Sequence, residues 1–202
     1  MRVTSIALAL LATALAFPAA AQSADPALVD AYIKSTFKNA PPQWQARVVQ
    51  DETQKVCSET RNTPSPAQAK SIEAREKASI VFPPDGNVLG DWKNGARIAQ
   101  NGRGGQFSDD EKTVNGGNCY ACHQMDPKEL SYGTMGPSLA EYGKIRKFSA
   151  EEAKQAYAKV YNAQSAQACS NMPRFGFHKF LSIEQIKDVT AYLMSPDSPV
   201  NK

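Results

Sequence analysis

The residues best suited to chemistry lie together in the segment CYACH at positions 119–123. Two cysteines separated by two residues and followed at once by a histidine form the pattern of covalent c-type haem attachment. At this spacing both thiols reach the two vinyl groups at one edge of the porphyrin, and the histidine lies beneath the iron. The pattern occurs once in the 202 residues. It therefore predicts one covalently bound haem c, tethered by Cys119 and Cys122, with His123 as an axial ligand.

Two other uses of paired cysteines fit the sequence less well. A zinc site needs two further clustered ligands, and the remaining cysteines, Cys57 and Cys169, do not form a second C-x-x-C pair. A redox-active C-x-x-C pair needs the βαβ setting of thioredoxin-like proteins, which the sequence does not show. Haem attachment remains the better interpretation.

A low-spin electron-transfer haem needs a second axial donor on its other face, and we predict that Met172 supplies it. Met172 lies in the turn-rich segment NMPRFG at 171–176, ten residues before a well-marked helix. Met125 lies only two residues beyond His123 and cannot cross the ring. Met194 is at the end of a helix, and the apolar face of that helix already accounts for a methionine at this position.

Three further donors stay open as alternatives to Met172. His178 is the only other histidine of the chain, and its alternative role is that of an exposed loop residue. Met135 precedes the segment GPSL at 136–139, which is better suited to wrap the His123 side, so its alternative role is packing. In that segment we expect the Pro137 carbonyl to accept a hydrogen bond from the second imidazole nitrogen of His123. The third alternative is a thiolate from Cys169.

The elements that must position these donors are mainly α-helices joined by long loops. No period-two strand pattern occurs, whereas helices are predicted at 25–38, 44–57, 67–80 and 91–99. Two more helices begin at Ser149 and Ser182, each the first residue of a Ser-x-x-Glu/Gln capping box, and the second runs to about Met194. A glycine-rich loop at 101–118 leads into the CYACH motif. Aromatic residues at helical spacing are predicted to form the core and the haem wall: Trp92, Tyr157, Tyr161 and Tyr192.

The N-terminus predicts export to the periplasm. Arg2 precedes an apolar stretch at 6–17 that is too short to span a bilayer, and Ala19 and Ala21 are the small residues expected before a cleavage site. We therefore predict a signal peptide at 1–21, an N-terminal helical extension at 22–89 and a cytochrome c domain at 90–202. In an exported chain Cys57 and Cys169 most simply form a disulfide. A free thiol or a bridge to a partner chain are the alternatives.

Composition excludes several classes of protein. The 23 basic and 20 acidic residues give a net charge of +3, too balanced for a nucleic-acid binder that must neutralise many phosphates. With 21% charged and 42% hydrophobic residues, the chain is neither a multi-span membrane protein nor a disordered tail. We expect no nucleic-acid partner and no membrane span after the signal peptide.

Several segments resemble known cytochromes. The helix at 91–99, CYACH, GPSL at 136–139 and Met172-Pro173 followed by the helix at 181–193 resemble the class I cytochrome c framework over about 90–195. A fuller set resembles the SoxX family over nearly the whole mature chain. This set comprises Cys57-Ser58, the segment 80–86, GDW at 90–92, GGNCYACHQ at 116–124 and NMPRFG at 171–176.

The resemblance to the SoxX family implies a function. SoxX is the small cytochrome subunit of the bacterial thiosulfate-oxidising SoxAX complex, an L-cysteine S-thiosulfotransferase. By that resemblance the chain forms a heterodimer with a SoxA-type cytochrome, whose haem is the catalytic centre that joins thiosulfate to a cysteine of the carrier protein SoxYZ. The chain itself accepts electrons and passes them to a downstream cytochrome, with His123 and Met172 as axial ligands.

Two other functions compete with this one. A free-standing periplasmic cytochrome shuttle needs the same haem residues, but it does not need the extension before residue 90 or the long interval at 100–118. A haem enzyme or gas sensor requires an open iron position, which Met172 is predicted to fill. The sequence also shows no general acid–base constellation beside CYACH.

Overall fold

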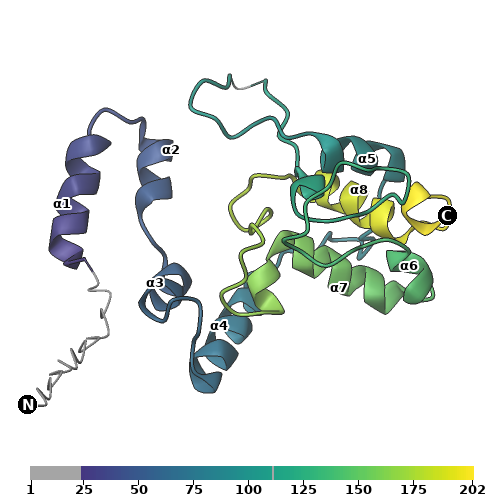
Figure 1. The fold of residues 1–202 in the computed structure, drawn as a ribbon, viewed down its shortest axis with the longest axis horizontal. Coiled ribbons are helices and arrows are strands. Elements are labelled where there is room, and N and C mark those ends of the chain that lie inside the picture. Colours follow the sequence, from purple (N-terminus) through teal and green to yellow (C-terminus); the bar gives the residue numbers. More distant parts are fainter. Residues whose placement is uncertain (1–23, 111) are drawn as a thin grey trace, which may run out of the picture. The chain divides into compact units, whose positions relative to one another are not determined.

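The computed structural model describes residues 24–110 and 112–202, and these segments contain helices and loops but no strand (Figure 1). The predicted signal peptide at 1–21 lies outside the described residues. The chain divides into two compact units, one ending at Val49 and the other running from Gln50 to Lys202. Within the described segments, no helix has both the length and the apolar character needed to cross a membrane.

The unit that ends at Val49 contains α1 (Pro26–Thr36), α2 (Pro42–Gln45) and a 3₁₀ turn, η1 (Ala46–Val48). The helix predicted at 25–38 is confirmed as α1. The Asp25 carboxylate accepts a hydrogen bond from the Ala27 backbone N–H at 2.9 Å, and Pro26 begins the helix without needing a hydrogen-bond acceptor. No residue of α1 is buried.

The single helix predicted at 44–57 is wrong. The chain leaves the helical conformation at Val49, and a new helix, α3 (Glu52–Glu59), begins after Asp51. Asp51 and Gln54 form a capping box, in which each side chain accepts a hydrogen bond from the backbone N–H of the other. Since this pairing requires an extended Asp51, it starts a helix and cannot sit inside one.

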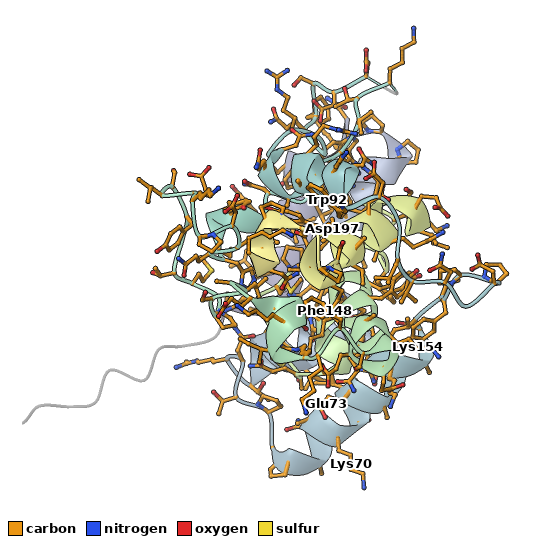
Figure 2. The ribbon with its side chains drawn as sticks, turned by 90° about the vertical axis from the view of Figure 1, so that its right-hand side faces the viewer. Lys70, Glu73, Trp92, Phe148, Lys154 and Asp197 are labelled. Atoms are coloured by element: carbon orange, nitrogen blue, oxygen red, sulfur yellow. A yellow bond between two sulfur atoms is a disulfide. The ribbon has the colours of Figure 1, made fainter. Side chains whose placement is uncertain are left out.

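The next helix, α4 (Pro66–Ala78), confirms the prediction at 67–80. Its Ser65 cap forms a second capping box with Gln68. A small apolar cluster of Ile72, Cys57 and Cys169 joins α4 to α3 and to a distant loop. Glu73 of α4, labelled in Figure 2, also accepts a hydrogen bond from the Ala168 backbone N–H at 3.3 Å.

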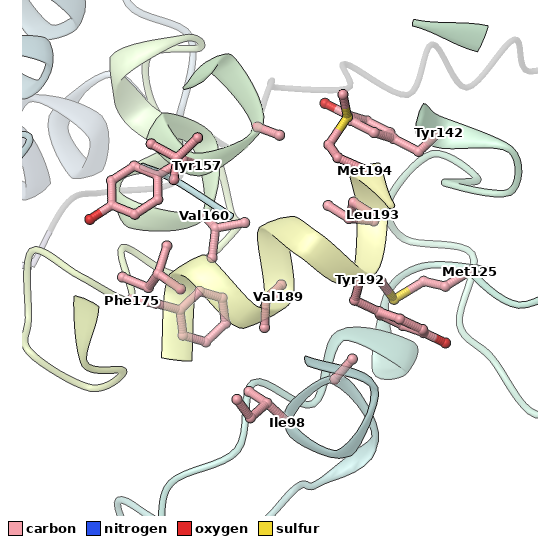
Figure 3. Close-up of a cluster of buried hydrophobic side chains, with 14 of the residues drawn as sticks. Ile98, Met125, Tyr142, Tyr157, Val160, Phe175, Val189, Tyr192, Leu193 and Met194 are labelled. Atoms are coloured by element: carbon pink, nitrogen blue, oxygen red, sulfur yellow. The ribbon is translucent and has the colours of Figure 1, made fainter. Parts of the chain in front are cut away.

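The main core is built on α8 (Ile183–Met194), against which α5 (Trp92–Gln100) and α7 (Ala150–Tyr161) both pack. A short helix, α6 (Tyr142–Ile145), also contacts α8. Figure 3 shows Val189, Leu193 and Met194 on α8, surrounded by side chains from the other elements. The helices predicted at 91–99 and after Ser149 and Ser182 are confirmed.

The two predicted capping boxes differ. Ser182 and Gln185 form the complete reciprocal pair. Ser149 caps α7 by accepting a hydrogen bond from the Glu152 N–H at 3.2 Å, but the Glu152 side chain forms an ion pair with Arg146 at 3.2 Å. Ser149 therefore caps α7, but the Glu152 carboxylate binds Arg146 and does not complete the capping box.

The helices α5 and α8 approach closely at Gly95. A Cβ atom there would lie 2.0 Å from the Asp188 backbone oxygen, so only glycine permits this crossing. The Asp188 carboxylate accepts hydrogen bonds from the Asp91 N–H at 2.7 Å and from the Asn94 side chain at 2.5 Å. These contacts hold the start of the predicted cytochrome domain on α8.

The aromatic residues occupy the core as predicted. Tyr157 and Tyr192 have no exposed surface, Tyr161 is 8% exposed, and Trp92 packs against the same cluster. The Tyr157 hydroxyl donates to the Val81 carbonyl at 2.9 Å. The segment before residue 90 is thus bound to α7.

Candidate haem site

The CYACH motif forms one tight turn. Cys119–Ala121 is a 3₁₀ helix, and the Cys119 carbonyl accepts hydrogen bonds from the backbone N–H groups of Cys122 at 3.1 Å and His123 at 2.9 Å. The turn follows Asn118, which has a left-handed backbone with φ of 47°. Neither Cys119 nor Cys122 is in a disulfide. The turn therefore brings both thiols and the imidazole together.

The surroundings of Cys119 suit a sulfur without charge. Burial, with a smaller contribution from Cys122, raises the pKa of the Cys119 thiol to about 12. A Cβ atom on Gly117 would lie 3.1 Å from the Cys119 sulfur, so the chain packs closely beside it. A thioether has no ionised form and no proton to lose, so a tethered sulfur fits this site.

The second nitrogen of His123 is held as predicted. Its Nδ1 atom lies 2.7 Å from the Pro137 carbonyl oxygen. Because a carbonyl only accepts hydrogen bonds, Nδ1 carries the hydrogen and Nε2 keeps its lone pair for a metal. Gly136 permits the approach, since a Cβ atom there would lie 2.2 Å from the His123 ring. The Gly136 N–H in turn donates to the Cys122 carbonyl at 2.8 Å.

Tyr120 joins the attachment turn to the core, a role that the sequence analysis did not find. Its hydroxyl lies 2.7 Å from the hydroxyl of Tyr192 on α8 and accepts a hydrogen bond from the Asp126 N–H at 3.0 Å. Burial and the bond to Tyr120 raise the pKa of Tyr192. The contact between the two hydroxyl groups ties the motif to α8.

Met172 lies in the loop between α7 and α8. Its side chain is partly buried and packs against the main core, and its N–H donates to the Ser170 hydroxyl at 3.2 Å. The Cys57–Cys169 disulfide predicted from the leftover cysteines is present, with the two Cα atoms 5.4 Å apart. Met172 therefore lies three positions after a covalent link to α3.

The alternative donors have other roles in the structure. Cys169 is in the disulfide, so a Cys169 thiolate ligand is excluded. Met125 and Met194 are buried in the core at 1% and 3% exposure. His178 is exposed and contacts the Phe177 ring edge-to-face, as the loop interpretation expects. Met135 is 78% exposed, so the packing role expected for it is wrong.

A buried ion-pair cluster involves Arg174, two positions after Met172, and the sequence patterns did not indicate it. Arg174 is 4% exposed and donates through Nη1 to the Glu76 carboxylate at 3.2 Å and through Nη2 to the Asp51 carboxylate at 2.5 Å. Asp51 is the N-cap residue of α3, and Glu76 lies in α4. No spacing in the sequence indicates pairs so far apart in the chain.

A hollow of about 640 Å³ borders the loop that bears Met172, at Gly176 and Phe180, and the segment before residue 119, at Val114 and Asn115. None of Cys119, Cys122, His123 and Met172 lines it. The fit to haem therefore rests on the donors: two unpaired thiols on one turn and an imidazole with Nε2 available.

Comparisons with known proteins identify the family of the chain. Residues 93–196, just over half of the chain, match the cytochrome c family. An "Uncharacterized lipoprotein" of Aquifex aeolicus (strain VF5) is 38% identical over 166 residues, which cover 78% of this chain and 76% of that protein. Members of the cytochrome c family carry covalently bound haem c and transfer electrons. The family match and the strandless helical architecture of the described residues together establish that this chain belongs to the cytochrome c family and has its mainly α, class I fold.

Proposed function

We propose that the chain is the monohaem cytochrome subunit of a SoxAX-type complex and relays electrons during thiosulfate oxidation. Cys119 and Cys122 tether one haem, and His123 and Met172 bind its iron. When bound, the haem supplies a one-electron redox couple. Because His123 and Met172 would both hold the iron, the chain alone would leave no position there for a substrate and would not be catalytic.

The reaction at the partner defines what this chain must do. Joining the outer sulfur of thiosulfate to a cysteine sulfur of a SoxYZ-type carrier forms one S–S bond and releases the thiol proton and two electrons. A monohaem subunit takes one electron at a time, so a downstream cytochrome must reoxidise it between the two transfers.

The observation that supports the assignment to a subunit is the attachment of the extension to the loop that bears Met172. Segments before residue 90 contact this loop through the Cys57–Cys169 disulfide and the pairing of Arg174 with Glu76. A free-standing shuttle, the alternative function, needs no such cover. Cys57 also belongs to one of the segments that carry the resemblance to the SoxX family.

Export to the periplasm is part of the proposal. The Cys57–Cys169 disulfide favours an oxidising compartment. The Aquifex aeolicus relative is named a lipoprotein, a class of exported proteins, and the sequence predicts a signal peptide at 1–21.

The test is purification of the C-terminally tagged holoprotein from periplasm. We expect a second c-type cytochrome to co-purify in equal amount. With that partner and a SoxYZ-type carrier present, thiosulfate should reduce the haem of this chain. The holoprotein alone should not be reduced by thiosulfate.

The matched control is the Cys119→Ser/Cys122→Ser chain, which lacks covalent haem. It should give no thiosulfate-dependent absorbance change from this subunit, so the change in the wild type is assigned to its haem. Purification of the wild type as a lone monomer would favour the free-standing shuttle instead.

A further inference from the structure

The loop that bears Met172 is attached to the extension on both sides. Cys169, three residues before Met172, forms the disulfide with Cys57 of α3. Arg174, two residues after Met172, forms ion pairs with Glu76 of α4 and with Asp51. Met172 therefore lies on a short span of backbone between two fixed points.

The Arg174 anchor is built for one position of the side chain. Its Nη1 and Nη2 atoms point to different carboxylates, and its guanidinium lies over the Phe177 ring, 4.4 Å from the ring centroid. Arg174 and Glu76 are 4% and 3% exposed. A planar guanidinium with two separate acceptors cannot rotate without losing one of them.

Glu76 is itself held in place by other elements. One carboxylate oxygen accepts hydrogen bonds from Asn162 at 2.6 Å and from Arg174 at 3.2 Å. The other oxygen accepts a hydrogen bond from the Thr53 hydroxyl. Asn162 follows the last residue of α7 and also donates to Ser79 at 3.1 Å. The Glu76 carboxylate thus joins α3, α4 and α7 at one buried point.

A buried pair of this kind stabilises position more than it stabilises folding. The desolvation of two charges offsets most of their attraction, but removing Glu76 leaves the buried Arg174 charge with Asp51 as its single remaining carboxylate partner. The backbone at Arg174 is therefore free to move only when Arg174 leaves both carboxylates. Any movement that carries Met172 away must therefore break these ion pairs.

We propose that Arg174 is a positioning residue whose pairing with Glu76 and Asp51 keeps Met172 on the haem iron. This inference rests on the proposed function, because it takes Met172 as the axial ligand. The disulfide fixes only the segment before Met172. The Arg174 pairs fix the segment after it, so both are required to hold the thioether in place.

The test measures how easily added imidazole displaces Met172 from the iron of the oxidised holoprotein. Glu76→Gln removes the charge that faces Arg174 and keeps the shape of the side chain. We expect imidazole to bind at least about tenfold more tightly than in the wild type, because one partner of a buried pair is lost. The far-red Met-to-iron absorption should weaken and the reduction potential should fall.

Two further variants separate positioning from general loosening. Glu59→Gln removes an exposed carboxylate from the last residue of α3, which lies outside the ion pairs of Arg174 and Glu76. We expect imidazole affinity to stay within about twofold of the wild type. Asp51→Asn keeps an N-cap residue for α3 and removes the second carboxylate from Arg174, so imidazole affinity should rise by less than in Glu76→Gln.

Each outcome decides the proposal. Unchanged imidazole affinity in a folded Glu76→Gln chain would overturn it, as would an equal increase in Glu59→Gln. If Glu76→Gln does not fold, the Asp51→Asn result decides in the same way. Absence of the far-red absorption from the wild type would instead reject Met172 as the ligand, and with it the proposed function's ligand set.

Discussion

The two sides of the candidate haem site are held by different means. On the His123 side the decisive hydrogen bond joins residues only 14 positions apart, His123 and Pro137. On the Met172 side the fixed points join residues 98 positions apart at Arg174 and Glu76, and 112 positions apart at the disulfide. The first side is mostly local, whereas the second depends on a remote part of the chain.

This difference bears on how each side forms and fails. A short loop closes at little entropic cost. The turn at 119–123 and the segment at 136–137 that contacts the His123 ring, here called the strap, therefore need few other contacts. The loop at 166–182 is held by contacts with the remote helices α3 and α4. We therefore expect perturbations of the extension to loosen the Met172 side while the haem stays attached.

The largest expected effect comes from breaking the attachment turn. The change Cys119→Ser/Cys122→Ser removes both thiols, so no thioether forms and covalent haem is lost. Extraction with acidic acetone and mass spectrometry of the chain measure this. The matched control, Cys57→Ser/Cys169→Ser, should retain one covalent haem, and loss of haem from it would contradict the division between the two sides.

The same control variant has the next largest effect, on stability. Removing a cross-link between residues 112 positions apart should lower the free energy of unfolding by about 2–5 kcal/mol. Urea unfolding measures the loss, and imidazole should displace Met172 more easily. Two free thiols in the denatured, unreduced wild type would show that the cross-link does not form.

A smaller effect is expected from Gly136→Ala, which tests the His123 side. The added methyl would lie 2.2 Å from the imidazole, so the strap must shift. We expect a loss of about 1–3 kcal/mol in unfolding free energy. Gly102→Ala is the control, since its methyl meets only the Asn118 side chain at 3.3 Å. A similar loss in both variants would argue against a specific role for Gly136.

The smallest effect concerns acid stability through Asp51. Burial alone would raise the pKa of Asp51, but the Gln54 N–H and the Arg174 guanidinium lower it below its ordinary value of 3.8. The charged form therefore contributes stability above pH 3.8, and this contribution is lost as the pH falls through the lowered pKa.

Asp51→Asn removes that contribution. Because the Asp51 side chain is 34% exposed, we expect a loss of about 1 kcal/mol at neutral pH, narrowing toward zero below pH 3.8. Urea unfolding across this pH range measures it. A gap that stays constant with pH would show that Asp51 does not titrate against Arg174.

Much of the fold was predictable from local pattern. The helices at 25–38, 67–80 and 91–99 and those after Ser149 and Ser182 follow from caps and apolar spacing, which act within a few residues. The error at 44–57 arose because that prediction overlooked the capping box of Asp51 and Gln54, which starts α3 inside this stretch. The assignment of Met172 stays a prediction, and the structure adds the fixed points around it.

By itself, the sequence predicted which residues attach the haem, because Cys119, Cys122 and His123 must be neighbours in the chain to reach one haem edge and its iron. It also indicated the strap at Pro137. Only the tertiary structure decided the pairing of Arg174 with Glu76 and the pairing of Tyr120 with Tyr192. These partners are 98 and 72 positions apart, and no periodicity records a contact that exists only after the helices have packed.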